Sequence, residues 1–206
     1  MKISNSKRKF IYLISPTKIN KEFFSDLKKV LSKKKTEFFQ LRLKKTPLQK
    51  KIFIGKKIKK ICKKFKVKFL INDDPWLAER LGADGCHLGQ KDISILKARK
   101  ILGKKIIGIT CHNSPLLAKK AIKDGADYLA FGAFYPTRTK KIKFKASIGF
   151  LKKIKKITKK PIVVIGGINN KNYKNLLLNK ANFLAISSFI FNNKKYKPEE
   201  AINKIK

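Results

Sequence analysis

The sequence predicts an α/β protein with the (β/α)8 TIM-barrel fold, and three observations lead to this prediction. Eight short apolar, β-branched or aromatic segments alternate with amphipathic, lysine-rich segments, a pattern typical of parallel strands joined by crossover helices. The chain has 206 residues, near the lower end of the size range of this barrel. No linker or shift in composition divides it. We therefore expect a single domain over residues 1–206.

Each predicted strand is followed by a predicted helix. The strands are FIYLI (10–14), EFFQLRL (37–43), KFLI (68–71), GCHL (85–88), IIGIT (106–110), YLAFG (128–132), IVVIG (162–166) and FLAIS (183–187). The helices cover 21–33, 48–64, 75–81, 93–101, 114–124, 147–157, 171–179 and 198–205. Pro75, Ser94 and Ser114 stand where helix starts are expected. The alternative is an open doubly wound sheet, which usually has a glycine-rich turn after its first strand. Here that strand leads into SPTKIN, which contains no glycine.

Composition excludes several classes of protein. With 43% hydrophobic residues, 10% aromatic residues and seven prolines, the chain is neither disordered nor collagen-like. No apolar run approaches the roughly 20 residues that cross a bilayer, and FIYLIS before Pro16 is too short for a secretory signal. Three irregularly spaced cysteines form neither a disulfide framework nor a zinc motif. We therefore expect a cytoplasmic location and no membrane partner.

The charge is strongly positive, with 53 Lys and Arg against 12 Asp and Glu and a formal net charge of +41. Nucleic-acid binding is the obvious alternative function, because a basic surface releases counterions from a polyphosphate. However, only five basic residues are arginines, which base readout favours, and the lysines lie along the whole chain. The pattern favours solvated helix faces over a designed patch, so we expect no specific nucleic-acid partner. The field still favours encounter with anionic small molecules.

In TIM barrels the chemistry lies at the carboxyl ends of the strands. Gln40, Arg42 and Lys44 have a spacing of two at the end of the second predicted strand, so they share one face. One amide and two cations pointing inward are costly unless an anion meets them. The pattern therefore favours an anion site, and an exposed polar strand face is the alternative.

Acidic residues follow the third and fourth predicted strands. Asn72, Asp73 and Asp74 come directly after the third strand, and Asp92 follows the fourth. Such residues often cap helices, but Mg²⁺ also commonly uses one or two carboxylates together with substrate phosphates. Asp73 and Asp92 are therefore candidate Mg²⁺ ligands. His87 in the same region is more simply a structural histidine.

Three further loops carry groups suited to phosphate oxygens. They offer hydroxyls, an ammonium and glycine backbone at the ends of the sixth, seventh and eighth predicted strands. Loops after strands seven and eight commonly hold a phosphate in this fold. The candidate residues are Thr137, Thr139, Lys140, Gly166, Gly167, Ser187 and Ser188. Two anion-holding regions and one cation site suggest chemistry between two phosphorylated small molecules.

Several motifs resemble those of the thiamine phosphate synthase family. They run in order and at the family's spacing from about residue 37 to 190. The matching stretches are QLRLK (40–44), INDDPWLAERLGADGCHLGQKD (71–92), IGITCH (107–112), GADYLAFGAFYPTRTK (125–140), IVVIGGI (162–168) and FLAISS (183–188). The resemblance implies a TIM barrel. It also implies the condensation of hydroxymethylpyrimidine diphosphate with hydroxyethylthiazole phosphate to thiamine phosphate and pyrophosphate.

The resemblance also implies roles for individual residues. Those implied to contact the pyrimidine diphosphate are Gln40, Arg42, Lys44, Asn72, Thr110 and Lys140, with Thr110 standing where the family commonly has Ser. Asp73 and Asp92 are implied to hold Mg²⁺. Those implied to bind the thiazole phosphate are Thr137, Thr139, Gly167, Ser187 and Ser188. Arg42, Lys44, Thr110 and Lys140 would act on the departing pyrophosphate in a dissociative mechanism.

The closest alternative is the thiazole tautomerase paralogue of this family, an isomerase that needs neither the diphosphate nor the metal. His112 lies where that paralogue's acid/base histidine would be. Asp73, Asp92 and the TxTK motif at 137–140 favour the synthase.

Overall fold

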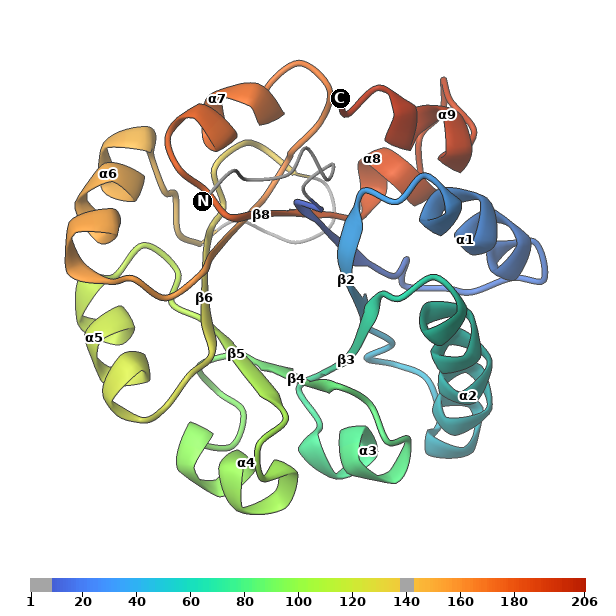
Figure 1. Ribbon diagram of the computed structural model, residues 1–206, viewed down its shortest axis with the longest axis horizontal. Helices are drawn as coiled ribbons and strands as arrows, with labels where there is room; N and C mark the ends of the chain where they lie inside the picture. The colour runs from blue at the N-terminus through green and yellow to red at the C-terminus, as the bar shows by residue number, and fades with distance from the viewer. Residues whose placement is uncertain (1–8, 138–142) are drawn as a thin grey trace, which may run out of the picture.

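The computed structural model describes residues 9–137 and 143–206. Eight parallel strands close into a barrel in chain order, and the last strand pairs with the first. Figure 1 shows the strands as a central ring with the helices arranged around its outside. The predicted (β/α)8 fold is confirmed.

The elements follow one another as strand and helix from the first strand onward. The strands are β1 (Ile11–Ile14), β2 (Thr36–Leu41), β3 (Lys68–Asn72), β4 (Gly85–Leu88), β5 (Ile106–Thr110), β6 (Tyr128–Gly132), β7 (Ile162–Ile165) and β8 (Phe183–Ile186). Within the described residues the helices are α1 (Phe23–Ser32), α2 (Leu48–Lys64), α3 (Pro75–Arg80), α4 (Ile95–Leu102), α5 (Pro115–Lys123), α6 (Ile148–Ile157), α7 (Tyr173–Leu178), α8 (Ser188–Phe191) and α9 (Pro198–Asn203).

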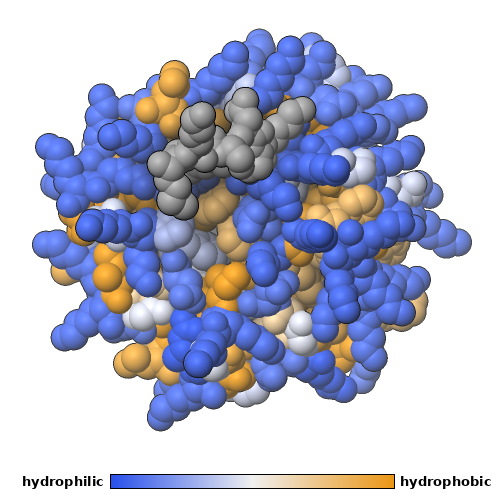
Figure 2. Space-filling view, viewed as in Figure 1, coloured by the Kyte–Doolittle hydropathy of each residue, from blue (hydrophilic) through white to orange (hydrophobic). Residues whose placement is uncertain are grey.

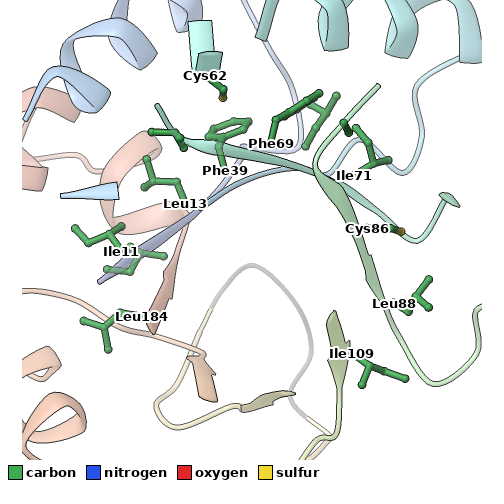
Figure 3. Close-up of a cluster of buried hydrophobic side chains, with 14 of the residues drawn as sticks. Ile11, Leu13, Phe39, Cys62, Phe69, Ile71, Cys86, Leu88, Ile109 and Leu184 are labelled. Atoms are coloured by element: carbon green, nitrogen blue, oxygen red, sulfur yellow. The ribbon is translucent and has the colours of Figure 1, made fainter. Parts of the chain in front are cut away.

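Alternation along the strands produces two separate apolar layers, because successive side chains point to opposite faces. The outer layer packs strands against helices. Figure 3 shows Phe39 and Phe69 on the side of their strands that faces Cys62 of α2. The inner layer fills the barrel with a smaller cluster. Its buried members are Tyr12, Ile14, Phe38, Leu70, Tyr128, Ala130, Val163 and Ala185. The barrel interior is therefore a packed core, which also holds the hydroxyls of Tyr12 and Tyr128.

Helix starts follow local hydrogen-bonding rules. The side chains of Asp74, Ser94, Ser114 and Ser147 accept the backbone N–H three residues ahead, at the starts of α3, α4, α5 and α6. These bonds satisfy donors that have no partner inside the helix. The predicted starts at Ser94 and Ser114 are confirmed, and Asp74 is a helix cap.

Strand β2 is shorter than the predicted segment 37–43. Its ladder with β3 ends at the pair Leu41 and Ile71, and the next N–H, that of Arg42, donates to Ser15 Oγ at 2.9 Å. Alternation nevertheless continues into the following turn, where Leu43 is buried in the outer layer and Lys44 is exposed. Arg42 and Lys44 thus lie beyond the strand instead of within it.

The short helix α8 was not predicted, because one helical turn is too short to show a periodic pattern. It begins at Ser188, directly after β8.

Hydrophilic side chains cover most of the face seen in Figure 2, with apolar side chains scattered between them. No helix in residues 9–137 or 143–206 is long and apolar enough to span a membrane.

Candidate active site

Polar residues gather at the carboxyl ends of β2 to β5. Gln40 is buried on the inward face of β2, and its Nε2 donates a hydrogen bond to Oδ1 of Asn72 at the end of β3. Pairing of β2 with β3 brings these two side chains together. The barrel thus assembles two of the predicted residues into one amide pair.

Asp73 and Asp92 meet although 19 positions separate them along the chain. Their side chains share a hydrogen bond, and Nζ of Lys44 lies 2.9 Å from Oδ2 of Asp73. The backbone N–H of Gly89 donates to Oδ2 of Asp92 at 2.6 Å. Asp73 is held in a left-handed conformation with φ of 65°, and its N–H donates to the carbonyl oxygen of His87 at 2.8 Å. The backbone therefore fixes the direction of the carboxylate.

The two carboxyl groups titrate apart. Burial alone would raise the pKa of Asp73, but hydrogen bonds from Lys44 and Asp92 hold that pKa below its ordinary value. Burial and the neighbouring Asp73 carboxylate raise the pKa of Asp92. Without a cation, burial and the repulsion between two adjacent negative charges both favour the protonated form of Asp92.

This pair fits a hard cation. Carboxylate oxygens are the ligands that Mg²⁺ prefers, and Mg²⁺ usually takes only one or two of them and completes its shell with water and phosphate oxygens. Within residues 9–137 and 143–206, no group of three or more His, Cys, Asp or Glu side chains is arranged to hold a metal. The donor set therefore fits Mg²⁺ in the kind and number of its carboxylates.

A chain of hydrogen bonds runs below Thr110. Nε2 of His87 lies 2.9 Å from Oγ1 of Thr110, and Nδ1 of His87 lies 2.8 Å from the hydroxyl of Tyr128. That hydroxyl lies 2.8 Å from the hydroxyl of Tyr12. Gln90 donates from Nε2 to the carbonyl oxygen of Thr110 at 2.6 Å. Burial lowers the pKa of His87 to about 4, so the imidazole is neutral at pH 7.

Arg42 adds a cation to the same mouth. It follows β2 and is half-buried. Among the described residues its guanidinium makes no ion pair with a carboxylate. A half-buried cation that no carboxylate neutralises is suited to an anionic ligand.

Three of the predicted phosphate residues, Thr137, Ser187 and Ser188, follow β6 and β8. Ser187 follows β8 and donates to the carbonyl oxygen of Ser15 at 3.3 Å, while Ser188 is exposed and begins α8. Thr137 is half-buried after β6. Thr139 and Lys140 lie outside the described residues.

Gly167 allows a close approach of two loops. Its φ is 60°, and a Cβ there would lie 2.2 Å from the carbonyl oxygen of Pro136. The segment after β6 crosses the end of β7 here, since the N–H of Tyr135 donates to the carbonyl oxygen of Gly166 at 3.1 Å. Glycine is therefore required for packing between the β6 and β7 loops.

A pocket of about 410 Å³ opens beside Asp73, between the ends of β2 and β3 and the helices α2 and α3. Its wall combines apolar groups with polar groups of the site. The lining residues are Leu41, Leu43, Lys44, Lys51, Ile71, Asn72, Asp73, Asp74, Trp76 and Leu77. The only tryptophan of the chain, Trp76, is 60% exposed at its rim.

Sequence reasoning missed three residues of this site. Ser15 follows β1 and is buried; it accepts the N–H of Arg42 and receives the Ser187 hydroxyl. A polar residue directly after an apolar strand was the signal that could have found it. Tyr12 and Tyr128 point into the barrel, and only the identity of the inward face reveals their contact with His87.

Comparisons with known proteins identify the family of this chain. A family model described as thiamine monophosphate synthase matches residues 11–190. The chain belongs to this thiamine monophosphate synthase family. It is 69% identical over 207 residues to the thiamine-phosphate synthase of Pelagibacter ubique, covering all of both chains. It is 43% identical over 153 residues to that of Marinobacter nauticus, covering 74% of this chain and 68% of the relative.

Solved structures match as well. Thiamine phosphate pyrophosphorylase from Pyrococcus furiosus superimposes with a TM-score of 0.84 and 28% identity, covering 97% of this chain and 94% of that one. A 3-hexulose-6-phosphate synthase at 15% identity and a TM-score of 0.63 shares the fold alone. Membership of the thiamine monophosphate synthase family makes this chain an enzyme of the transferase class.

Proposed function

We propose that this chain joins 4-amino-5-hydroxymethyl-2-methylpyrimidine diphosphate to 4-methyl-5-(2-phosphoethyl)thiazole in a Mg²⁺-dependent reaction. The products are thiamine phosphate and pyrophosphate. The observation that carries this proposal is the contact between Asp73 and Asp92 beside Lys44 at the strand ends. Such a pair is suited to a diphosphate presented with a divalent cation.

The diphosphate would lie over the ends of β2 to β5. Asp73 and Asp92 would hold Mg²⁺, and Arg42, Lys44 and Lys140 would face the diphosphate oxygens. When bound, Mg²⁺ would neutralise negative charge that builds on the departing pyrophosphate. The cationic side chains do the same work, because donors fixed in advance cost no reorganisation during the reaction. Gln40, Asn72 and Thr110 would contact the pyrimidine and its diphosphate.

Bond breaking would precede bond making. The bond between the exocyclic carbon of the pyrimidine and the diphosphate oxygen breaks, and its electron pair leaves with pyrophosphate. The lone pair of the thiazole nitrogen then forms the new carbon–nitrogen bond. No proton moves in either step, so the site needs no general base. A neutral, half-buried His87 agrees with this requirement.

The thiazole phosphate would lie at the ends of β6 to β8, against Thr137, Thr139, Gly167, Ser187 and Ser188. Anchoring this phosphate would hold the thiazole nitrogen next to the bound pyrimidine. Because both reactants are then bound, the attack no longer has the entropic cost of bringing two free molecules together. Ser187 and Ser188 follow β8, whereas Arg42 and Lys44 follow β2, and this distribution of polar residues over different strand ends supports a two-substrate reaction.

The decisive experiment measures pyrophosphate release by the full chain with each precursor omitted in turn and with Mg²⁺ removed by EDTA. We expect release only when both precursors and Mg²⁺ are present, in amounts equal to the thiamine phosphate formed. Release without the thiazole would indicate a diphosphate hydrolase instead. Conversion of the thiazole alone would indicate the tautomerase activity of the paralogue.

We also propose a cytoplasmic location. Cys62, Cys86 and Cys111 are all buried and unpaired, as is usual for proteins of reducing compartments.

A further inference from the structure

The hydrogen-bonded chain from Tyr12 to Thr110 is built into the barrel core. Tyr12 and Tyr128 are 1% and 3% exposed. The ring of Tyr128 stacks on that of His87, with centroids 5.6 Å apart and planes 16° apart. Gly108 on β5 makes room for the stack, since a Cβ there would lie 1.8 Å from Cζ of Tyr128. Packing thus holds the two tyrosine rings and the ring of His87 in place, and Thr110 is half-buried at the strand end.

The direction of the hydrogen bonds in this chain follows from counting buried protons. Within the described residues, the only hydrogen-bond partner of the Tyr12 hydroxyl is the Tyr128 hydroxyl. If Tyr128 donated to Tyr12, the proton of Tyr12 would have no acceptor, and a buried unpaired donor costs about 1–3 kcal/mol. If Tyr12 donates to Tyr128, the Tyr128 proton is free to reach Nδ1 of His87.

The same proton count determines the tautomer of His87. Nδ1 accepts from Tyr128, so Nε2 carries the ring proton and donates to Oγ1 of Thr110. The opposite tautomer would point Nδ1–H at the Tyr128 oxygen and leave a tyrosine proton without an acceptor. A doubly protonated ring fails the same count. Only one arrangement satisfies every buried proton of the chain.

We propose that this chain is polarised from Tyr12 through Tyr128 and His87 to Thr110, so that the Thr110 hydroxyl proton is directed at an anionic oxygen of the substrate. His87 is then a positioning residue that acts through Thr110. The inference rests on the proposed function for the identity of that anion, the diphosphate, but the polarity itself depends only on the barrel core.

The polarity can be read directly by nitrogen NMR of the full chain labelled with ¹⁵N-histidine. The sequence has two histidines, His87 and His112, so a His112→Asn variant assigns the two rings. At pH 7 we expect His87 to carry its proton on Nε2, with Nδ1 unprotonated. A proton on Nδ1 would overturn the proposal, whether or not the protein makes thiamine phosphate.

Substitutions of Tyr12 and Thr110 test the consequences. Tyr12→Phe removes only the terminal donor of the chain, so we expect the ring proton of His87 to stay on Nε2. Under the reverse polarity the same substitution would remove the only acceptor for the Tyr128 proton.

Thr110→Val removes the directed proton and is expected to lower kcat about 10- to 100-fold with little change in KM. Thr110→Ser retains the hydroxyl, so its kcat should stay within about threefold of wild type. Equal kcat values for the Val and Ser variants would contradict the role of that proton. Absence of turnover in the wild-type chain would instead contradict the proposed function and leave the tautomer result standing.

Discussion

At the scale of single residues, the contact between Asp73 and Asp92 is the least favourable feature of the mouth unless something positive lies between the two groups. Lys44 supplies one positive group 2.9 Å from Asp73, and burial together with the Asp73 carboxylate raises the pKa of Asp92, which favours a proton there as a second one. A divalent cation would replace that proton and gain both carboxylates as ligands. The pair is therefore the place to test the dependence on Mg²⁺.

We expect Asp73→Asn and Asp92→Asn to lower Mg²⁺-dependent turnover by at least about 100-fold, because each removes a charged ligand from the proposed cation. Turnover is measured as pyrophosphate release at saturating precursors across a Mg²⁺ titration. Asp74→Asn is the matched control. Its side chain caps α3 by accepting the N–H of Leu77, and Asn caps helices as well as Asp. Wild-type Mg²⁺ dependence in both site variants would refute the metal assignment.

His87 gives a pH dependence of stability. Its pKa is about 4 in the folded chain against an ordinary 6.5, so the unfolded chain binds a proton at pH 5 that the folded chain does not. The contribution of His87 to the free energy of unfolding is therefore complete above about pH 6.5 and is lost as the pH falls toward 4, by at most about 3 kcal/mol.

Urea unfolding at pH 7, 6, 5 and 4.5 measures this slope. The neutral amide of His87→Gln does not titrate, so we expect the variant to lose less stability than wild type over the same range. The comparison also cancels the titration of carboxyl groups that both proteins share. Identical slopes for the two proteins would contradict the assignment to His87.

At the scale of elements, the same pair of residues, a buried alanine followed by Asp or Asn, precedes β4, β6 and β8. In each case an alanine is buried at 3% exposure or less, and the next residue turns back to bind the start of the preceding strand. Asp84 accepts the N–H of Phe69, Asp127 that of Ile107, and Asn182 that of Ile162, at 2.8 to 2.9 Å. These bonds satisfy an N–H within the first two residues of β3, β5 and β7 and fix the register of strand pairs.

We expect Asp84→Ala to destabilise the fold by about 1–3 kcal/mol, because it leaves the N–H of Phe69 without its acceptor in a half-buried position. Asp84→Asn is the control that the chain itself suggests, since Asn182 holds the equivalent place with an amide oxygen. It should cost clearly less. The free energy of unfolding in urea measures both, and an equal loss in the two variants would show that the charge of Asp84, and not its hydrogen bond, matters.

The sequence predicts elements in proportion to their length and regularity. Helix α2 and strand β4 have the predicted bounds, 48–64 and 85–88, because long periodic segments and runs bounded by turn residues carry the strongest signal. The predicted end of β2 at residue 43 was wrong, because the hydrogen bond from the N–H of Arg42 to Ser15 Oγ depends on a residue 27 positions away. Local sequence does not encode such partners.

The site follows the same rule. Residues at or directly after the end of a strand, such as Asn72 and Asp73, could be predicted as candidates, because the strand end itself marks them. Contacts such as Asp73 with Asp92 follow from the barrel topology. Tyr12 and Tyr128 escaped prediction because both strand faces are apolar, so their inward direction depends on the closed barrel.

At the scale of the whole molecule, the charge is the dominant feature. A net charge of +41 means that most lysines have no acidic partner, since the chain has only 12 Asp and Glu. Like charges distributed over a compact surface repel one another and oppose folding. Surface ion pairs such as that of Lys120 with Asp124 each contribute little in water. Salt should therefore stabilise this fold, because it weakens the repulsion between lysines more than it weakens the few ion pairs.

We expect the free energy of unfolding in urea to rise when NaCl is increased from about 20 mM to about 300 mM, because the screening length shortens to less than the spacing of many surface charges. KBr at the same ionic strength is the control, since a screening effect depends on concentration and not on the identity of the salt. A fall in stability with both salts would mean that attractive ion pairs outweigh the repulsion.

The same field separates the proposed enzyme from a nucleic-acid-binding protein. Lysines scattered over the helices give attraction without base recognition, so duplex DNA should bind weakly and lose its affinity steeply by about 200 mM salt. Fluorescence anisotropy with two unrelated duplexes measures this, and both should behave alike. Turnover with the two precursors should persist at that salt, because Arg42, one of the cations proposed to face the diphosphate, is half-buried and is screened less than an exposed lysine. Tight, sequence-dependent binding that survives 200 mM salt would instead make nucleic acid a specific partner of this barrel.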